Sequence, residues 1–331
     1  MKKFIILLII IVAIFGFWYY RAISAPADAK AGLIYFTVEK GESLASIGAD
    51  LQKAGLIKNP FAFKLYGKFQ GAATKIMAGE YNLSASMSIK EIIATLASGK
   101  NVNQEKIITI IEGWRASDMA NYLENQRLFK KEEFLSGIKI ERWRADYSFL
   151  ADATGQTLEG YLFPDTYRVF NDAKPDDVIK KMLDNFGAKF TVQMAADLKN
   201  KNMNIFEAIT LASIVEREAL SASDKAMVAD VFLKRLRDRI GLQSDATVNY
   251  ITGKKDLRPS LTDLAIDSPY NTYKYRGLPP GPISNPGLIS IRAVIYPATN
   301  DYFYFLTDQD GVAHYGRTYA EHQANIQKYL E

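Results

Sequence analysis

The sequence predicts an α+β protein with three kinds of structure in succession. It opens with an uninterrupted apolar run from Phe4 to Tyr20, which is long enough for a transmembrane helix. A pattern of strand, helix, helix, strand and helix then occurs twice, with a period of roughly 72–80 residues. The remainder is a mixed α/β block with many aromatic and turn-forming residues. We therefore expect an anchor at 1–21, a linker at 22–34, modules at 35–100 and 101–186, and a third block at 187–331.

The composition excludes several classes of function. The net charge of +4 is small and evenly spread over 331 residues, which argues against a nucleic-acid-binding protein. The chain has no cysteine, so disulfides, zinc–thiolate sites and thiol catalysis are excluded. His314 and His322 are neither three nor four residues apart, and no phosphate-binding loop, dinucleotide fingerprint or nucleophile elbow occurs. We expect no metal and no cofactor.

The N-terminal run predicts a membrane anchor. About seventeen residues at about 1.5 Å each reach about 26 Å, near the lower limit for a span. Lys2-Lys3 precedes the run and favours a cytoplasmic N-terminus, and Trp18-Tyr19-Tyr20 closes it as an interfacial belt. The alternative is a cleaved signal peptide, since Ala22-Ile23-Ser24 resembles a cleavage site. Three consecutive aromatic residues favour the anchor, so the chain after Arg21 should lie outside the cytoplasm.

The two modules are predicted because strands, turns and helices follow in the same order in both segments. In the first, a strand at 34–38 leads through a glycine turn into a helix that begins near Ser43. In the second, a strand at 107–111 leads through a similar turn into a helix near Ser117. Chance similarity of two ordinary βα pieces is the alternative. Two further pairs correspond, namely Gly79–Leu83 with Glu159–Leu162, and a helix at 89–96 with one at 177–183.

The third block combines helices with an unusual loop. Helices are predicted at 205–219 and 225–239. The segment 276–287, Arg-Gly-Leu-Pro-Pro-Gly-Pro-Ile-Ser-Asn-Pro-Gly, cannot form a helix or a central strand and is too apolar for a linker. We expect it to form a stiff wall beside an extended ligand. Strands at 291–295 and 302–306 and a helix from Tyr319 should follow.

Glu216 is the most unusual residue of the 205–219 helix. At about 100° per residue it falls on the apolar stripe with Ile205, Ile209 and Ala212, whereas Glu218 turns toward the polar border. A Glu against apolar walls loses hydration of its charged form, so it should hold a proton nearer to neutral pH than an exposed Glu does. A general acid needs this property. The alternative is a Glu that pairs with an arginine or lies on the surface.

Polar and aromatic residues in the third block suit a sugar polymer. Amides and carboxylates bond hydroxyl and acetamido groups, and aromatic faces stack on pyranose rings. Each residue alone could be a turn or cap residue, so the prediction depends on their grouping near a candidate acid. A serine hydrolase is not expected, because Ser213 has no identifiable histidine partner. The predicted substrate-binding residues are Ser213, Glu218, Gln243, Asp245, Tyr250, Asn271 and Tyr273.

Several motifs resemble the endolytic murein transglycosylase family, also called YceG-like. The similarity extends over nearly the whole chain, with the motifs in the same order as in the family. Two positions depart from the family pattern, since Ser244 often corresponds to Thr and Ala246 to Pro. The motifs are Leu211-Ala-Ser-Ile-Val-Glu-Arg-Glu218, Leu242-Gln-Ser-Asp-Ala-Thr-Val-Asn-Tyr250, Ser268-Pro-Tyr-Asn-Thr-Tyr273, Gly277-Leu-Pro-Pro-Gly-Pro-Ile283 and Glu159-Gly-Tyr-Leu-Phe-Pro-Asp-Thr-Tyr167.

The resemblance implies a lytic transglycosylase of the inner (cytoplasmic) membrane whose catalytic domain, 187–331, is periplasmic. It implies that residues 35–100 form a LysM-like domain, a fold associated with N-acetylglucosamine polymers. The implied partners are peptidoglycan glycan strands and peptidoglycan synthases such as penicillin-binding proteins, beside which nascent strands are terminated. The implied catalytic residue is Glu216, the first acid of Val-Glu-Arg-Glu.

The implied mechanism needs one carboxyl group. Glu216 would protonate the oxygen that links N-acetylmuramic acid to N-acetylglucosamine, and would then take a proton from the muramic C6 hydroxyl, which closes a 1,6-anhydro ring. Glycosidases normally use two carboxylates. The residues alone leave open a hydrolytic muramidase with Asp245 as base, and a non-catalytic, membrane-anchored peptidoglycan-binding scaffold.

Overall fold

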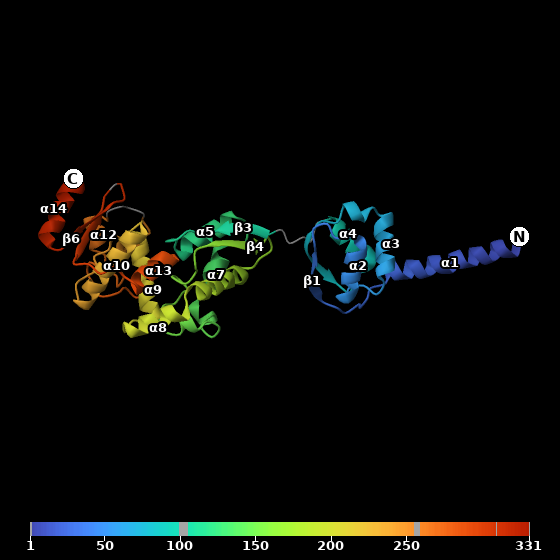
Figure 1. Cartoon of the computed structure of the whole chain (residues 1–331), viewed down its shortest axis with the longest axis horizontal. Helices are drawn as coiled ribbons and strands as arrows, with labels where there is room; N and C mark the ends of the chain where they lie inside the picture. The colour runs from blue at the N-terminus through green and yellow to red at the C-terminus, as the bar shows by residue number, and fades with distance from the viewer. Residues whose placement is uncertain (1, 99–104, 255–258, 309, 331) are drawn as a thin grey trace. The chain divides into compact units, whose positions relative to one another are not determined.

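The computed structural model describes residues 2–98, 105–254, 259–308 and 310–330, which form two compact units divided near residue 105 (Figure 1). The predicted boundary between residues 100 and 101 lies outside the described residues. Each unit has its own hydrophobic core of buried residues.

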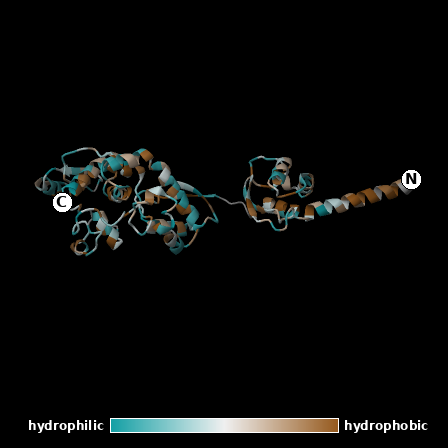
Figure 2. Ribbon diagram, turned by 90° about the horizontal axis from the view of Figure 1, so that it is seen from below, coloured by the Kyte–Doolittle hydropathy of each residue, from teal (hydrophilic) through white to brown (hydrophobic). Residues whose placement is uncertain are grey.

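The first unit begins with helix α1, Lys2–Ser24. Its segment Phe4–Ser24 is long and apolar enough to cross a membrane, and no other helix of the described residues meets this criterion. Figure 2 shows hydrophobic residues along most of α1. At its C-terminal end Ile23 is buried in the core of the unit. The helix is longer than the predicted apolar run because Ala22-Ile23-Ser24 continues it.

The rest of the first unit is a two-stranded antiparallel sheet covered by helices. Strands β1 and β2 pair with Phe36 opposite Tyr81. The Ser43 hydroxyl caps α2 by accepting a hydrogen bond from the Ser46 backbone N–H, at 3.2 Å, as the predicted helix start requires. The elements are β1 Leu33–Val38, α2 Leu44–Lys53, α3 Pro60–Phe69, the 3₁₀ turn η1 Ala72–Thr74, β2 Gly79–Ser84 and α4 Ile89–Ser98.

The second unit opens with the same order of elements, because β3 pairs with β4 and two helices lie between them in sequence. One landmark of the predicted repeat is wrong. Glu159–Leu162 is a turn, and the strand comes later, at Thr166–Phe170. The backbone N–H groups of Gly160 and Leu162 donate to the Asn285 side chain, so this segment is held by a side chain rather than by a strand. The elements are β3 Glu105–Thr109, α5 Ala116–Asn125, α6 Lys131–Gly137, η2 Ile140–Arg142, η3 Ser148–Leu150, β4 Thr166–Phe170 and α7 Pro175–Lys189.

The remaining elements of the second unit surround α9, Ile205–Glu218. One core extends from Ile108 to Ile295, so the segments predicted as a second module and a third block share their buried residues. Asn204 caps α9 by accepting from the Glu207 N–H at 2.8 Å. The other elements are α8 Val192–Asn200, α10 Ala222–Arg237, α11 Asp245–Thr252, α12 Leu261–Leu264, α13 Leu288–Ile295, β5 Tyr304–Thr307, β6 Ala313–Gly316 and α14 Tyr319–Tyr329.

The strand predicted at 291–295 is wrong, because these residues belong to helix α13. Ile291, Val294 and Ile295 are buried there against the core. A short apolar run reads equally well as a strand or a buried helix, and here packing on α9 and α10 selects the helix. The strand predicted at 302–306 corresponds to β5, which pairs antiparallel with β6.

Candidate active site

The last turn of α9 carries both glutamates of the Val-Glu-Arg-Glu motif, and they face different surroundings. Glu216 turns toward α10 and α13, with which α9 packs. Glu218 turns toward the start of α11. Residues two positions apart on a helix point about 200° apart around its axis, which explains why Glu216 and Glu218 contact different elements.

The Glu216 carboxylate is a buried ion-pair partner. Its Oε1 lies 2.6 Å from the Lys225 ammonium of α10, and the two side chains are 6% and 5% exposed. Its Oε2 accepts from the Gly287 backbone N–H at 2.9 Å and from the Ser290 hydroxyl at 2.7 Å. Gly287 is the N-cap residue of α13. Glu216 therefore joins α9, α10 and α13, and the paired alternative is realised with a lysine rather than an arginine.

A second acid lies beside Glu216. Burial, followed by the negative charge of Glu216, raises the pKa of Glu112, and the Lys225 ammonium opposes this effect. Glu112 also approaches the backbone at Gly287, where an added Cβ would lie 1.9 Å from its Oε1. Glycine at this position therefore leaves room for the Glu112 side chain.

The Glu218 carboxyl lies at the N-terminal end of α11. It accepts hydrogen bonds from the Ser244 hydroxyl and from the Ala246 backbone N–H. Burial raises the pKa of Glu218 to about 7, and the nearby charge of Asp245 acts in the same direction, whereas the two hydrogen bonds oppose the rise. A carboxyl group with this pKa is protonated in a large fraction of molecules near neutral pH, which is what a general acid requires.

Asp245 and Tyr273 complete this group. The Tyr273 hydroxyl donates to Asp245 Oδ1 at 2.6 Å, and burial together with the Asp245 carboxylate raises the pKa of Tyr273. The loop that carries Gln243 lies against the Tyr273 segment, because the Gln243 N–H donates to the Thr272 carbonyl at 3.2 Å. Gln243 is exposed and has a positive φ of 52°. Four predicted site residues, Glu218, Gln243, Asp245 and Tyr273, are thus brought together.

Two other predicted residues have structural roles. Ser213 is fully buried, and its hydroxyl donates to the Thr210 carbonyl and accepts from the Ile283 N–H at 3.0 Å. It therefore fastens the proline-rich loop to α9. Asn271 is also fully buried, and its amide nitrogen donates to the Leu264 and Ile266 carbonyls.

Tyr250 connects the site with the beginning of the second unit. Its ring lies 5.0 Å from the Tyr270 ring and 5.1 Å from the Arg115 guanidinium carbon. Arg115 also donates to the Asn249 carbonyl at 2.9 Å, so residues on both sides of the predicted 186/187 boundary meet here. Sequence reasoning did not identify Arg115, because no local pattern pairs residues so far apart.

A buried carboxyl network supports the proline-rich loop. Glu159 accepts two hydrogen bonds from the Ala116 N–H and one from the Asn285 amide, at 2.6 Å. Burial raises the pKa of Glu159 to about 7, and the positive charge of Arg115 opposes the rise. In the sequence, only the motif at 159–167 pointed to Glu159. No sequence pattern pointed to Lys225, because its pairing with Glu216 depends on how α9 and α10 pack.

No group of three or more His, Cys, Asp or Glu side chains with the arrangement of a metal site occurs among the residues that the structure describes. His314 instead contacts Asp308 at 2.7 Å. At the end of α9 the structure brings carboxyl groups, hydroxyls and the Tyr273 ring together.

Comparison with known proteins supports the family resemblance over most of the chain. A model of the YceG-like family matches residues 36–328. The chain belongs to the YceG-like family. A Bacillus subtilis (strain 168) relative named endolytic murein transglycosylase is 33% identical over 328 residues, which are 95% of this chain and 90% of the relative. A relative with the same name from Streptococcus pneumoniae (strain R6) is 32% identical over 99% of this chain, which spans 65% of that longer protein.

A solved structure extends the relationship to the fold. The crystal structure of a YceG-like protein from Listeria monocytogenes aligns with a TM-score of 0.61 and 31% identity, and the alignment covers 89% of this chain and 99% of that one. The predicted family and the mixed α/β fold are confirmed, whereas the LysM-like character of residues 35–100 stays a prediction.

Proposed function

We propose that this YceG-like protein is an endolytic peptidoglycan lytic transglycosylase, a carbon–oxygen lyase that cleaves the bond between N-acetylmuramic acid and N-acetylglucosamine within glycan strands. The product would be a 1,6-anhydromuramoyl end. One observation carries the chemical part of the proposal, namely Glu218, whose pKa is raised to about 7 beside Asp245 and Tyr273. The names of the relatives from Bacillus and Streptococcus support the reaction class.

In this mechanism Glu218 acts twice. Its protonated carboxyl group donates to the glycosidic oxygen while the C1–O bond breaks and positive charge develops at C1. The resulting carboxylate then takes the proton of the muramic C6 hydroxyl, whose oxygen bonds to C1. Proton and charge balance within one turnover, and no water is consumed. Asp245, held by the Tyr273 hydroxyl, would supply negative charge near the developing cation.

Glu216, the acid predicted from helix periodicity and implied by the family resemblance, has surroundings less suited to this role. Both of its oxygens are engaged, by the Lys225 ammonium, the Gly287 N–H and the Ser290 hydroxyl. Donating a proton from such a group would first require breaking an ion pair between side chains that are nearly inaccessible to solvent. We therefore propose Glu218 as the acid, and Glu216 as a residue that holds three helices together.

A hydrolytic muramidase is the second candidate function, because Asp245 could serve as a base for water. The two reactions give products that differ by one water. A non-catalytic scaffold would bind glycan without producing new ends of either kind.

The location that fits this function is the inner (cytoplasmic) membrane. The apolar helix Phe4–Ser24 supports an anchor, with the N-terminus in the cytoplasm and the catalytic part, which includes 187–331, in the periplasm. A tethered enzyme there would meet nascent strands beside peptidoglycan synthases, such as penicillin-binding proteins, and would terminate their elongation.

The deciding experiment incubates the purified full chain in detergent with isolated glycan strands and analyses the fragments by mass spectrometry. Anhydromuramoyl ends without incorporation of oxygen from labelled water are expected. Reducing muramic ends that carry solvent oxygen would make the enzyme a muramidase. Unchanged strands that nevertheless sediment with the protein would make it a scaffold.

A further inference from the structure

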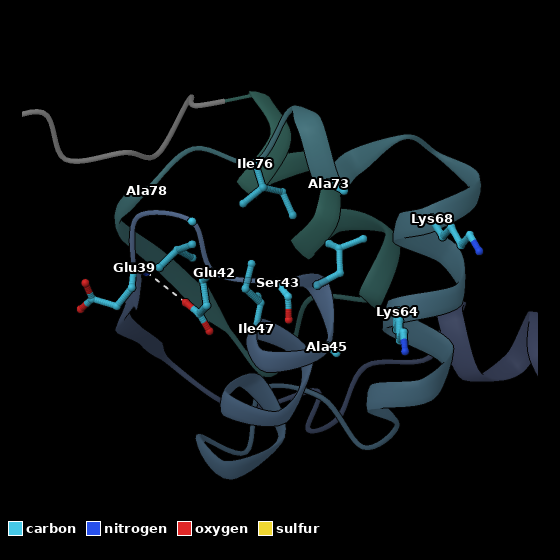
Figure 3. Close-up of a pocket in the computed structure, with 13 residues that line it drawn as sticks. Glu39, Glu42, Ser43, Ala45, Ile47, Lys64, Lys68, Ala73, Ile76 and Ala78 are labelled. Atoms are coloured by element: carbon cyan, nitrogen blue, oxygen red, sulfur yellow. Dashed lines mark hydrogen bonds between the residues drawn. The ribbon is translucent and has the colours of Figure 1, made fainter.

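A cavity of about 530 Å³ opens in the first unit, where β1 leads into α2 (Figure 3). Its walls come from the end of β1, the turn before α2, the start of α2, one face of α3, and η1 with the segment that joins it to β2. This volume can hold a small ligand. The charged residues that line it are Glu39, Glu42, Lys64 and Lys68.

The charged side chains of this cavity are separated by sign. Figure 3 shows Glu39 and Glu42 on one side and Lys64 and Lys68, both from α3, on the other. Neither lysine ammonium has an ion-pair or hydrogen-bond partner within the described parts of the chain. Both lysines are exposed and available to an anion.

Glu42 provides the second observation. Its Oε2 accepts from the Glu39 backbone N–H at 3.0 Å, whereas its Oε1 is buried and has no partner among the described residues. A buried carboxylate oxygen without a donor is costly, so such groups are usually satisfied by water, an ion or a ligand. Glu42 lines the cavity, and a carboxylate forms its stronger hydrogen bonds with charged donors such as an ammonium group.

The uncharged part of the lining favours small alkyl groups. It consists of Ala, Leu, Ile and Val side chains together with Gly41 and Ser43, and none of the described lining residues is aromatic. Sugar rings are commonly held by stacking on aromatic faces, which this cavity does not offer. Methyl groups of a short peptide suit it better.

We propose that this cavity binds a short zwitterionic peptide, with its ammonium group at Glu42 and its carboxylates at Lys64 and Lys68. The choice of peptide rests on the proposed function: the stem peptide of peptidoglycan is rich in alanine and carries a free amino group and carboxylates. The first unit would thus select strands by their peptides, while the site at Glu218 cleaves the glycan.

The test measures binding of a synthetic stem peptide, N-acetyl-L-Ala–γ-D-Glu–L-Lys–D-Ala–D-Ala, to the full chain in detergent by calorimetry; the N-acetyl group leaves the lysine amine as its one ammonium. Acetylating the lysine amine, or amidating the C-terminus, should each weaken binding about tenfold, because each removes one charge-assisted hydrogen bond. Hydrogen–deuterium exchange should show protection by the peptide in segments 38–47 and 73–78.

Matched variants locate the effect. Glu42→Gln should abolish the preference for the free amine over the acetylated one, and Lys64→Gln with Lys68→Gln should abolish the preference for the free C-terminus. The control is Lys53→Gln with Lys58→Gln, which removes the same charge from exposed lysines that do not line the cavity and should bind as the wild type does.

Two outcomes would overturn the proposal: equal binding of the charged and blocked peptides, or protection of the same segments by a peptide-free chitooligosaccharide instead of the peptide. Cleavage of peptide-free glycan strands separates this result from the fate of the proposed function. The cavity variants should retain that cleavage, and its absence from the wild type would count against the lyase while leaving the peptide measurement interpretable.

Discussion

The two sides of the last turn of α9 each carry a glutamate, Glu216 on one and Glu218 on the other, but the groups around the two carboxyls differ. On the side of Glu216, a carboxylate is paired with Lys225 and bonded to α13, so its charge is neutralised inside the protein. On the side of Glu218, the carboxyl has a hydroxyl and a backbone N–H as donors and another acid, Asp245, nearby, so its charged form is poorly supported. In the proposed mechanism, the first arrangement stabilises the fold and the second prepares a proton for transfer.

This difference teaches that burial of an acid is not by itself a sign of catalysis. What distinguishes the two sites is a direct ion pair: the Lys225 ammonium lies 2.6 Å from Glu216, whereas Arg217 and Arg235 act on Glu218 only through their charge. Four substitutions test this difference between the two sides, each with a matched variant.

The largest effect should come from Glu218→Gln. Glutamine preserves the shape of the side chain but has no transferable proton, so cleavage should fall by about 10²–10⁴-fold or more, since one residue serves both proton transfers. The measurement is the rate of release of anhydromuramoyl ends. The matched control is Glu216→Gln, assayed at equal folded concentration, which should remain active. The reverse pattern would restore the assignment made from helix periodicity.

Lys225→Met should have the largest effect on stability. It leaves the Glu216 carboxylate buried without its cation, and removal of one partner of a buried pair costs about 3–5 kcal/mol. Urea unfolding followed by circular dichroism measures the free energy of unfolding. The double variant with Glu216→Gln should recover much of the loss. If the double variant lost as much stability as the two single variants together, Lys225 and Glu216 would not be coupled.

Gly160→Ala tests the packing of the proline-rich loop, which leads to the Glu216 side. An added Cβ would lie 2.6 Å from Pro282 Cγ and 2.8 Å from Ile209 Cγ2, at a φ of +91°. Overpacking and strain together should cost about 2–4 kcal/mol. Gly253→Ala is the control, since its φ of +72° is similar but nothing lies within 4 Å of the added atom. Equal losses would show that backbone strain alone matters.

The smallest effect concerns the pH profile. A general acid works when protonated, so activity should fall as pH rises through about 7, the pKa of Glu218. Ser244→Ala removes a hydrogen bond that lowers this pKa, so the alkaline limb should move to higher pH. The control Ser290→Ala removes the corresponding hydroxyl from Glu216 and should leave the limb unchanged. A shift in the control instead would implicate Glu216.

Much of the local structure follows from the sequence. The helix over Ile205–Glu218, the cap at Ser43 and the order of elements in both β–α–α–β–α runs were predictable, because periodicity and capping act between near neighbours. The two misassigned segments, at 159–162 and 291–295, are those whose conformation depends on distant partners: Asn285 in one case and the α9–α10 surface in the other.

The sequence by itself determined the family, the apolar N-terminal helix and the presence of two acids at the end of α9. Only the tertiary structure decided which groups surround each acid. Helical periodicity separates a buried face from an exposed one when one side of the helix contacts water. Because α9 is covered on nearly all sides, periodicity does not predict which of the two glutamates is the more buried. Lys225, Ser290 and Gly287 reach Glu216, while Ser244 and Asp245 lie beside Glu218. Because these partners come from other elements, the chain had to fold before the two carboxyls differed.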